Sequence, residues 1–241
     1  MQGLSSRRAI SGILCRMMLE TIDLETAARP DAAVIWLHGL GADGNDFVPV
    51  VPELVKQGER AWRFVFPHAT PRPVTLNGGM RMRAWYDIIS LDRRSAEDEV
   101  GFRDTDAAIR QLIARELARG IAVHRIVLAG FSQGGAISLY TGLRYPERLA
   151  GVMALSTYLP LAGRLGAERA AVNLATPIFM AHGHSDPVLP CNLGVESREL
   201  LKTLGYSVEW HEYPMAHSLC AAEIADIRGY LLRVLPNVNL P

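Results

Sequence analysis

The pentapeptide Gly130-Phe131-Ser132-Gln133-Gly134 places a serine hydroxyl between glycines, a pattern that serves nucleophilic catalysis. The apolar run at 125–129 predicts a buried strand before it, and apolar residues spaced i, i+3, i+4, i+7 from Ala136 predict a helix after it. A very tight turn between them, a nucleophile elbow, would lift the hydroxyl clear of the sheet. Side chains at the two outer glycines would collide with the strand and the helix. The alternative interpretation is a glycine-rich turn that happens to carry a serine.

A serine hydroxyl is a poor nucleophile at neutral pH, so it needs a histidine base that a carboxylate holds in the right tautomer. Where an elbow carries the serine, the chain order is serine, acid, histidine. Asp186 fits the acid, because it follows a predicted strand in the turn at 182–187. Ser-Asp-Pro is also ordinary turn chemistry. Glu209 and Glu212 are weaker candidates, since both lie within a predicted strand.

His217 fits the base, because it follows the last predicted strand and precedes the last predicted helix. Its other interpretation is a histidine that merely begins this helix. His211 is the competitor, but it lies in mid-strand and cannot project from the end of the sheet. His182 and His184 precede Asp186, which is the wrong order.

The tetrahedral oxyanion of such a reaction needs two backbone N–H donors. One is expected from Gln133, directly after the nucleophile. The other is expected from the early glycine-rich loop His38-Gly39-Leu40-Gly41, with Leu40 as the donor. His38 itself is expected to be a packed, hydrogen-bonded loop residue and not a catalyst.

The elements that must position these residues alternate between strands and helices, which predicts an α/β fold with a mainly parallel central sheet and helices on both faces. Only residues 157–177 separate two late strands, so no large cap domain is expected. Strands are predicted at 33–37, 62–66, 125–129, 151–155, 178–181 and 207–212. Helices are predicted at 46–56, from Asp104 or Thr105 to Gly120, after the elbow, at 196–204 and at 221–234.

Residues 67–98 form a long stretch with the proline and glycine content of irregular structure, and such loops are usually covers or binding loops. Leu76, Met80, Met82 and Trp85 are expected to line a shallow apolar groove here. A groove of this kind favours short and medium acyl chains. The alternative is that these side chains only pack the loop onto the sheet.

Composition excludes several classes of function. Lysines and arginines number 25 against 25 aspartates and glutamates, and no basic stripe points to nucleic acid. No apolar run approaches the ~18 residues of a membrane span, so no stable membrane insertion is expected. The three cysteines, Cys15, Cys191 and Cys220, lack metal-ligand spacing and predict reduced thiols in a cytoplasmic protein, with a Cys191–Cys220 disulfide as the alternative. No metal site is expected.

The chain is expected to hold a disordered extension at residues 1–18 and one α/β domain at 19–241. Ser6-Arg7-Arg8 and the apolar residues after it are similar to a twin-arginine export signal. The apolar stretch is short, however, and Arg16 ends it without a small-residue cleavage site. A disordered extension is therefore favoured over an export signal, and a start of the chain at Met17 or Met18 is a further interpretation.

Beyond the elbow, the chain resembles the acyl-protein thioesterase/carboxylesterase family of α/β-hydrolases, also labelled the phospholipase/carboxylesterase family. The resemblance covers about residues 30–235, and in two places the chain departs from the family. Ala216 stands where the family often has glycine before the histidine, and the N-terminal extension has no counterpart. The matching blocks are His38-Gly39-Leu40-Gly41 with Asp43, Pro67 and Ala69 before Asn77-Gly78-Gly79, Ala84-Trp85-Tyr86-Asp87, Gly130 to Gly135, His182-Gly183 with Asp186-Pro187, and His217-Ser218.

The resemblance implies a triad of Ser132, Asp186 and His217, an oxyanion hole at Leu40 and Gln133, and an acyl pocket beside the Trp85 loop. The expected function is a cofactor-free serine esterase or thioesterase, monomeric or homodimeric, that works through an acyl-serine intermediate. Its substrates would be small acyl esters or thioesters, with acylated proteins as further candidates. A serine peptidase or amidase, or a non-catalytic binding module on the same scaffold, remains the alternative.

Overall fold

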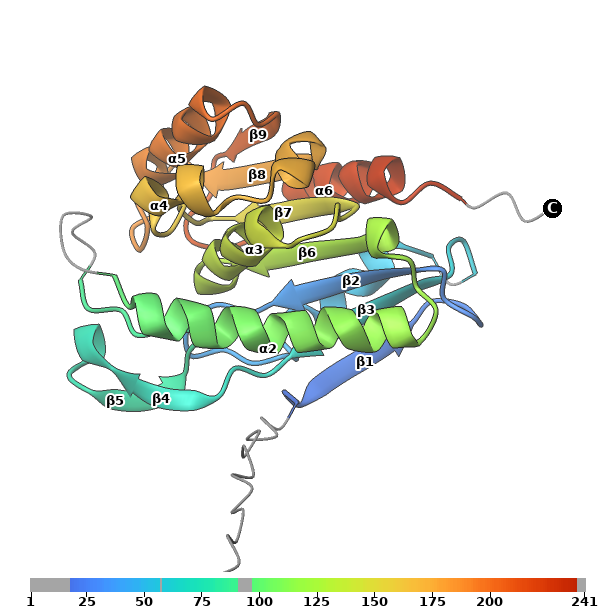
Figure 1. Cartoon of the computed structure of the whole chain (residues 1–241), viewed down its shortest axis with the longest axis horizontal. Helices are drawn as coiled ribbons and strands as arrows, with labels where there is room; N and C mark the ends of the chain where they lie inside the picture. Colours follow the sequence, from blue (N-terminus) through green and yellow to red (C-terminus); the bar gives the residue numbers. More distant parts are fainter. Residues whose placement is uncertain (1–17, 57, 91–96, 238–241) are drawn as a thin grey trace, which may run out of the picture.

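The computed structural model describes residues 18–56, 58–90 and 97–237. The extension expected at 1–18 therefore lies, apart from Met18, outside the described residues. The centre is a seven-stranded sheet in the order β1-β3-β2-β6-β7-β8-β9, in which β1 is antiparallel to β3 and the remaining neighbours are parallel (Figure 1). Its strands are β1 (Thr21–Glu25), β2 (Ala32–Leu37), β3 (Trp62–Pro67), β6 (Ile126–Phe131), β7 (Gly151–Leu155), β8 (Ile178–Gly183) and β9 (Val208–Tyr213).

Strands β2, β3, β6, β7 and β8 are buried along their whole length, which explains why the sequence shows each of them as a mainly apolar run, interrupted by Arg63 in β3 and His182 in β8. The six predicted strands are confirmed to within two residues at either end. The edge strand β1 was not predicted, because it is short and its positions are only half-buried or exposed.

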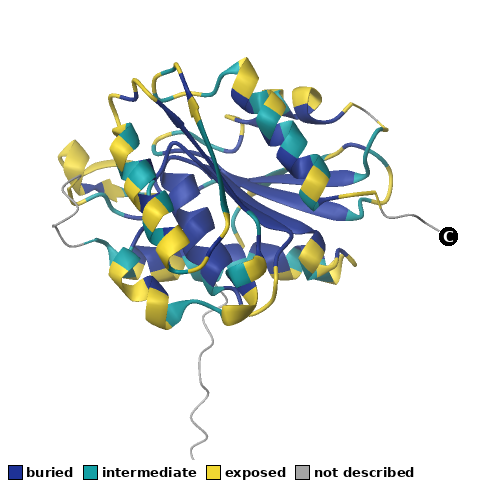
Figure 2. Ribbon diagram, turned by 90° about the horizontal axis from the view of Figure 1, so that it is seen from above, coloured by how far each residue is buried: buried dark blue, intermediate teal, exposed yellow. Residues whose placement is uncertain are grey.

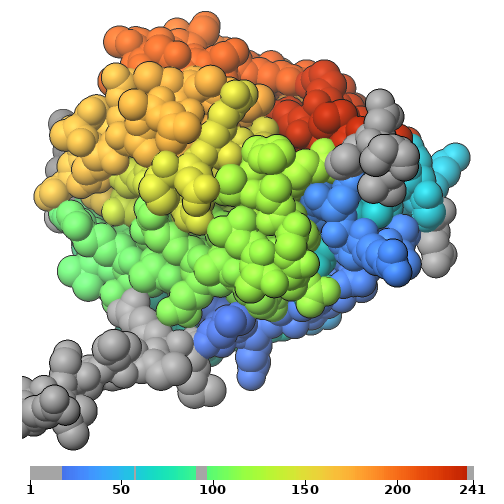
Figure 3. Space-filling view, turned by 45° about the vertical axis from the view of Figure 1, so that its right-hand side comes forward, coloured from blue at the N-terminus to red at the C-terminus, as the bar shows by residue number. Residues whose placement is uncertain are grey.

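Helices cover both faces of the sheet, as predicted. One face carries α2 (Glu99–Ala118), α3 (Gln133–Arg144), α4 (Ala162–Glu168) and α5 (Cys191–Thr203), and the other carries α1 (Val51–Leu54) and α6 (Ala221–Val234). The strands are buried between these layers, and the helices turn exposed residues outward (Figure 2). The outer surface from α2 to α5 is continuous, as expected for a single domain (Figure 3). None of the described helices is long and apolar enough to cross a bilayer.

Two helices begin earlier than the sequence predicted. Helix α2 begins at Glu99, and its N-cap is Asp98, whose carboxylate accepts a hydrogen bond from the Gly101 N–H at 2.9 Å. Thr105 does not cap this helix, because its hydroxyl donates to the Trp85 carbonyl. Helix α5 begins at Cys191 directly after Pro190, five residues before the predicted start.

The stretch expected to be irregular contains a second, two-stranded sheet. Strands β4 (Pro71–Val74) and β5 (Met80–Arg83) pair antiparallel, and the short 3-10 turn η2 (Thr75–Asn77) joins them. Gly78 and Gly79 both have positive φ, 66° and 78°, which closes the connection. This hairpin projects from the carboxyl end of the main sheet, beside α2 (Figure 1).

Candidate active site

Ser132 stands between the last residue of β6 and the first residue of α3, at the carboxyl end of the sheet. Its backbone has φ 54° and ψ −120°, a conformation that costs a non-glycine residue on the order of 1–3 kcal/mol. Two hydrogen bonds hold it there. The Ser132 N–H donates to the Leu155 carbonyl at 2.8 Å, and the Thr157 hydroxyl donates to the Ser132 carbonyl at 2.7 Å.

The glycines of the pentapeptide are required by close backbone contacts. A Cβ on Gly130 would lie 2.2 Å from the Gly134 carbonyl, and a Cβ on Gly134 would lie 2.4 Å from the Leu37 carbonyl oxygen. Helix α3 therefore packs directly against strands β6 and β2, and this packing fixes where the serine points. The predicted elbow is confirmed, together with the steric reason for its glycines.

The acid and base candidates meet where the chain leaves β8 and β9. His217 Nδ1 donates to Asp186 Oδ2 at 2.6 Å. The other carboxylate oxygen, Oδ1, accepts the backbone N–H groups of Val188 and Leu189, each at 2.8 Å. Asp186 is 6% exposed, so these three donors replace water around a buried carboxylate.

The two loops that carry Asp186 and His217 are tied to each other through the backbone. The His184 N–H donates to the Tyr213 carbonyl at 2.8 Å, and the Ser185 N–H donates to the Met215 carbonyl at 3.1 Å. Gly183 allows this approach, because a Cβ there would lie 2.4 Å from the Met215 oxygen. The acid turn (residues 184–189) and the base loop (residues 214–217) therefore form one unit.

The competing residues lie elsewhere. His211 packs against Phe179 and its Nε2 lies 3.1 Å from Glu209 Oε1, on the α6 side of the sheet. His184 pairs instead with Glu212, at 3.2 Å from Nδ1 to Oε2. None of these two histidines and two glutamates lines the cavity at Ser132.

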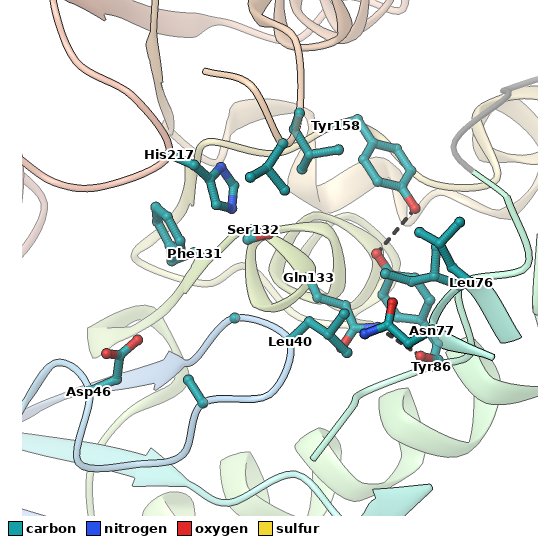
Figure 4. A pocket seen from close by; sticks show the side chains of 15 residues that line it. Leu40, Asp46, Leu76, Asn77, Tyr86, Phe131, Ser132, Gln133, Tyr158 and His217 are labelled. Atoms are coloured by element: carbon teal, nitrogen blue, oxygen red, sulfur yellow. Dashed lines mark hydrogen bonds between the residues drawn. The ribbon is translucent and has the colours of Figure 1, made fainter. Parts of the chain in front are cut away.

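Ser132 and His217 line one cavity of about 370 Å³ (Figure 4). The His217 ring lies above Ser132 and packs against the Phe131 ring, with 4.7 Å between the ring centres. Within the described part of the chain, no hydrogen bond joins the serine hydroxyl to the imidazole. Such contacts are often long in ligand-free sites and shorten when a substrate binds.

The two expected oxyanion donors flank the same cavity. The N–H groups of Leu40 and Gln133 donate to no other group in residues 18–56, 58–90 and 97–237. The loop that carries Leu40 is fixed by a hydrogen bond from the Gly41 N–H to the Arg83 carbonyl, at 2.9 Å. Gln133 N–H is the first of the helix N-terminal donors, so the α3 dipole adds to its attraction for a negative oxygen.

His38 is a packed, hydrogen-bonded loop residue, as predicted. Its Nε2 accepts the Ala69 N–H at 3.0 Å, and its Nδ1 donates to the Gly39 carbonyl at 2.6 Å. Burial lowers the pKa of His38 to about 4. The ring is therefore neutral at neutral pH, and both of its nitrogens are already engaged.

The four side chains expected to line the acyl groove separate in the structure. Leu76 lines the cavity, but Trp85 is only 2% exposed and belongs to the core between α2 and the sheet. The Trp85 indole N–H donates to the His38 carbonyl at 2.8 Å, and its backbone N–H donates to Gln133 Oε1 at 2.8 Å. Met80 is 63% exposed, and neither Met80 nor Met82 lines the cavity.

Other residues form the wall that Trp85 and the two methionines were expected to form. The hydroxyls of Tyr86 and Tyr158 lie 3.1 Å apart on the side of the cavity opposite Phe131 (Figure 4). The sequence offered a signal for Tyr158, Val188 and Leu189, because each of them follows the carboxyl end of a predicted strand. The apolar wall consists of Leu40, Leu76, Ile88, Val188 and Leu189.

No group of three or more metal-ligating side chains occurs in the part of the chain that the structure describes. Cys191 and Cys220 are both unpaired there. Cys15 lies outside the described residues.

Comparison with known proteins gives one consistent result. A family model described as phospholipase/carboxylesterase matches residues 22–235. The chain is 42% identical over 220 residues to acyl-protein thioesterase 1 of Neurospora crassa, covering 88% of this chain and 90% of the relative. It is 40% identical to acyl-protein thioesterase 1 of Mycosarcoma maydis, covering 89% and 96%. Among solved structures, Zea mays acyl-protein thioesterase 2 superimposes with a TM-score of 0.80 at 27% identity, covering 90% of this chain and 99% of that one.

Proposed function

Because the chain belongs to the phospholipase/carboxylesterase family of α/β-hydrolases and is a serine esterase or thioesterase, we propose that Ser132, Asp186 and His217 are its catalytic triad. One observation carries this proposal. The hydrogen bond from His217 to the buried Asp186 carboxylate orients an imidazole over the serine of the elbow, inside a cavity that Ser132 and His217 both line. The bond fixes the Nδ1–H tautomer, so Nε2 is the nitrogen left to accept a proton.

The reaction follows from this arrangement. Ser132 Oγ attacks the carbonyl carbon of an ester or thioester while His217 Nε2 accepts its proton. The N–H groups of Leu40 and Gln133 bind the tetrahedral oxyanion. His217 then protonates the leaving alcohol or thiol, which leaves an acyl group on Ser132. A water molecule that His217 deprotonates attacks the acyl-serine, releases the acid and restores the serine, so the kinetics are ping-pong.

The substrate that fits is a thioester or ester with an apolar acyl chain. The relatives near 40% identity are named acyl-protein thioesterases, and we extend acylated proteins to this chain as substrates. The wall of Leu76, Ile88, Val188 and Leu189 offers an apolar surface for the acyl chain. The size of this groove favours short and medium acyl chains. Each methylene that it buries adds ~0.8 kcal/mol to the binding free energy, but only until the groove is full. Unpaired Cys191 and Cys220 support a location in the reducing cytoplasm.

Active-site labelling tests the nucleophile. A fluorophosphonate probe is expected to label the protein once, at Ser132, and Ser132→Ala is expected to abolish labelling and reduce thioester hydrolysis by about 10⁴- to 10⁶-fold. Ser138→Ala is the matched control, because Ser138 is a buried serine on the same helix whose hydroxyl donates to the Gly134 carbonyl. Labelling that persisted in the Ser132 variant would disprove the assignment.

The base is tested in the same assay. His217→Ala is expected to abolish both labelling and turnover, whereas His211→Ala is expected to retain both, since His211 lies on the α6 side of the sheet. Equal losses in two folded variants would show that the base has been assigned to the wrong histidine.

A further inference from the structure

His182 lies beside the proposed triad and has no part in the mechanism above. It is the penultimate residue of β8 and is fully buried. Its position before Asp186 in the chain excludes it as the base of a serine, acid, histidine order. The polar contacts of its ring nevertheless all lead to the acid.

The Nε2 side of the His182 ring faces the turn that holds the carboxylate. His182 Nε2 lies 2.8 Å from the Leu189 carbonyl oxygen and 3.4 Å from Asp186 Oδ2. The N–H of the same Leu189 donates to Asp186 Oδ1. His182 therefore holds Leu189 by its carbonyl while Asp186 holds it by its N–H. Asp186 Oδ2 lies between two imidazoles, those of His182 and His217.

The other side of the ring fixes its protonation. His182 Nδ1 is buried without a hydrogen-bond partner among the described residues, and a Cβ on Gly194 would lie 2.6 Å from it. Because the Leu189 carbonyl can only accept, the single proton of the neutral ring sits on Nε2. A second proton at Nδ1 would be buried and unpaired. Burial accordingly lowers the pKa of His182, which stays a neutral donor at neutral pH.

We propose that His182 is a positioning residue for Asp186. Its Nε2–H anchors the turn at 186–189, and this anchor keeps Oδ2 aimed at His217 Nδ1. The proposal rests on the proposed role of Asp186 as the acid of the triad. A displacement of the Asp186 carboxylate by about 1 Å would lower the rate on the order of 10²-fold, even with Ser132 unchanged.

Two amide substitutions distinguish a positioning role of the His182 N–H group from a role of the side chain in packing alone. His182→Gln carries an N–H near the position of Nε2, whereas His182→Asn carries its N–H near the position of Nδ1. We expect His182→Asn to lower kcat by about 10- to 100-fold, with KM changed far less, and His182→Gln to recover most of the loss. Rates are normalised to active sites counted by fluorophosphonate titration, so that unfolded protein does not contribute.

A double-mutant cycle tests whether His182 acts through Asp186. In an Asp186→Asn background, His182→Asn is expected to cause no further loss of kcat, because the carboxylate that it positions is gone. Equal activity of the Gln and Asn variants, or a full additional loss in the Asp186→Asn background, would overturn the proposal. High activity of Asp186→Asn alone would instead refute the triad, so the two failures are distinguishable.

Gly194→Ala provides a second route if His182→Asn does not fold. The added methyl group would press on Nδ1 from the α5 side and displace the ring without removing its donor. The same fall in kcat, again absent in the Asp186→Asn background, is expected. Full activity of a folded Gly194→Ala enzyme, with no fall in kcat, would count against a positioning role.

Discussion

Gln133 has two separate tasks at the site. Its backbone N–H is a proposed oxyanion donor, while its side chain accepts the Trp85 N–H and donates to the Tyr86 carbonyl at 2.7 Å. Trp85 in turn donates to the His38 carbonyl, two residues before the other donor, Leu40. Trp85 thus links the two sides of the oxyanion hole, through its indole N–H on the His38 side and its backbone N–H on the Gln133 side, and it does not line the cavity.

Leu76 and Trp85 are therefore expected to affect catalysis differently. Leu76→Ser removes apolar surface from the groove and should lower kcat/KM for medium-chain substrates, by about fourfold for each substrate methylene that is no longer buried, with little effect on acetyl esters. Trp85→Phe removes only the indole donor and should lower kcat for all chain lengths alike. A series of p-nitrophenyl esters from short to long acyl chains measures both profiles. A flattened profile in Trp85→Phe, or an unchanged one in Leu76→Ser, would contradict these roles.

The site shows which residues a sequence can identify. Ser132, Asp186 and His217 follow strands at the same edge of the sheet, so chain order and strand ends are enough to propose them as a triad and to predict that Asp186 and His217 lie together. The residues that line the groove were harder to predict, because the composition of a loop does not reveal which of its side chains face the sheet. Trp85 was expected at the surface of the groove. It lies in the core instead, where its apolar surface is buried and its indole N–H has a hydrogen-bond acceptor in the His38 carbonyl.

Among the elements, α6 begins with an unusual buried carboxyl. Glu223 lies in its first turn, is fully buried, and neither of its oxygens has a hydrogen-bond partner among the described residues. Burial raises its pKa from 4.5 to about 8. Between pH 4.5 and about pH 8, Glu223 therefore holds a proton in the folded state that it has released in the unfolded state. The stability that this group contributes is therefore fully present below pH 4.5 and is lost as the pH rises toward 8.

Glu223→Gln should remove this pH dependence. Urea unfolding between pH 6.5 and 8.5 is expected to show the wild-type protein losing stability, at no more than about 1.4 kcal/mol per pH unit, while the variant loses much less. The window avoids His38, whose lowered pKa destabilises the fold only as the pH falls below 6.5. Glu53→Gln, on the exposed side of α1, serves as the control. Identical pH slopes in wild type and Glu223→Gln would show that the carboxyl is ionised in the fold.

The starts of elements were predicted less well than their interiors. Apolar periodicity places α6 and the buried strands correctly, because it reports directly on burial. The start of α2 depends instead on which of three aspartates or threonines near 98–105 has a free hydrogen-bonding side chain. Thr105 is engaged by the Trp85 carbonyl, a contact between residues twenty positions apart that no local pattern contains.

At the scale of the whole molecule, the two ends of the sheet have different tasks. Ser132, Asp186 and His217 stand at the carboxyl end of the parallel strands. At the amino end of β3, Arg63 forms ion pairs with Asp23 at 2.5 Å, Glu25 at 2.7 Å and the fully buried Glu116 at 3.1 Å. This cluster joins the antiparallel edge strand β1 to α2, and it is far from the residues that would perform the chemistry.

Arg63→Met should therefore reduce stability without reducing activity. Removing the guanidinium takes from the buried Glu116 the ion pair at 3.1 Å and leaves it with Arg115 at 2.9 Å and Arg119 at 3.8 Å, and breaking a buried pair typically costs about 3–5 kcal/mol. Urea unfolding measures the loss, and thioester turnover per titrated active site should match that of the wild type. Arg81→Met, at an exposed position of β5, should cost less than about 0.5 kcal/mol. A stability of Arg63→Met equal to that of the control would show that the cluster does not secure β1.

The backbone tie between the acid turn and the base loop also determines how the enzyme opens. Because the His184 and Ser185 amides are bonded to Tyr213 and Met215, these amides can exchange with solvent only when the His217 loop moves away. Ser132, at the centre of the sheet, belongs to a more protected part. A local opening would therefore remove both partners from the serine in one step. Such an opened form would keep the elbow but lack its proposed base, and activity would return when the tie re-forms.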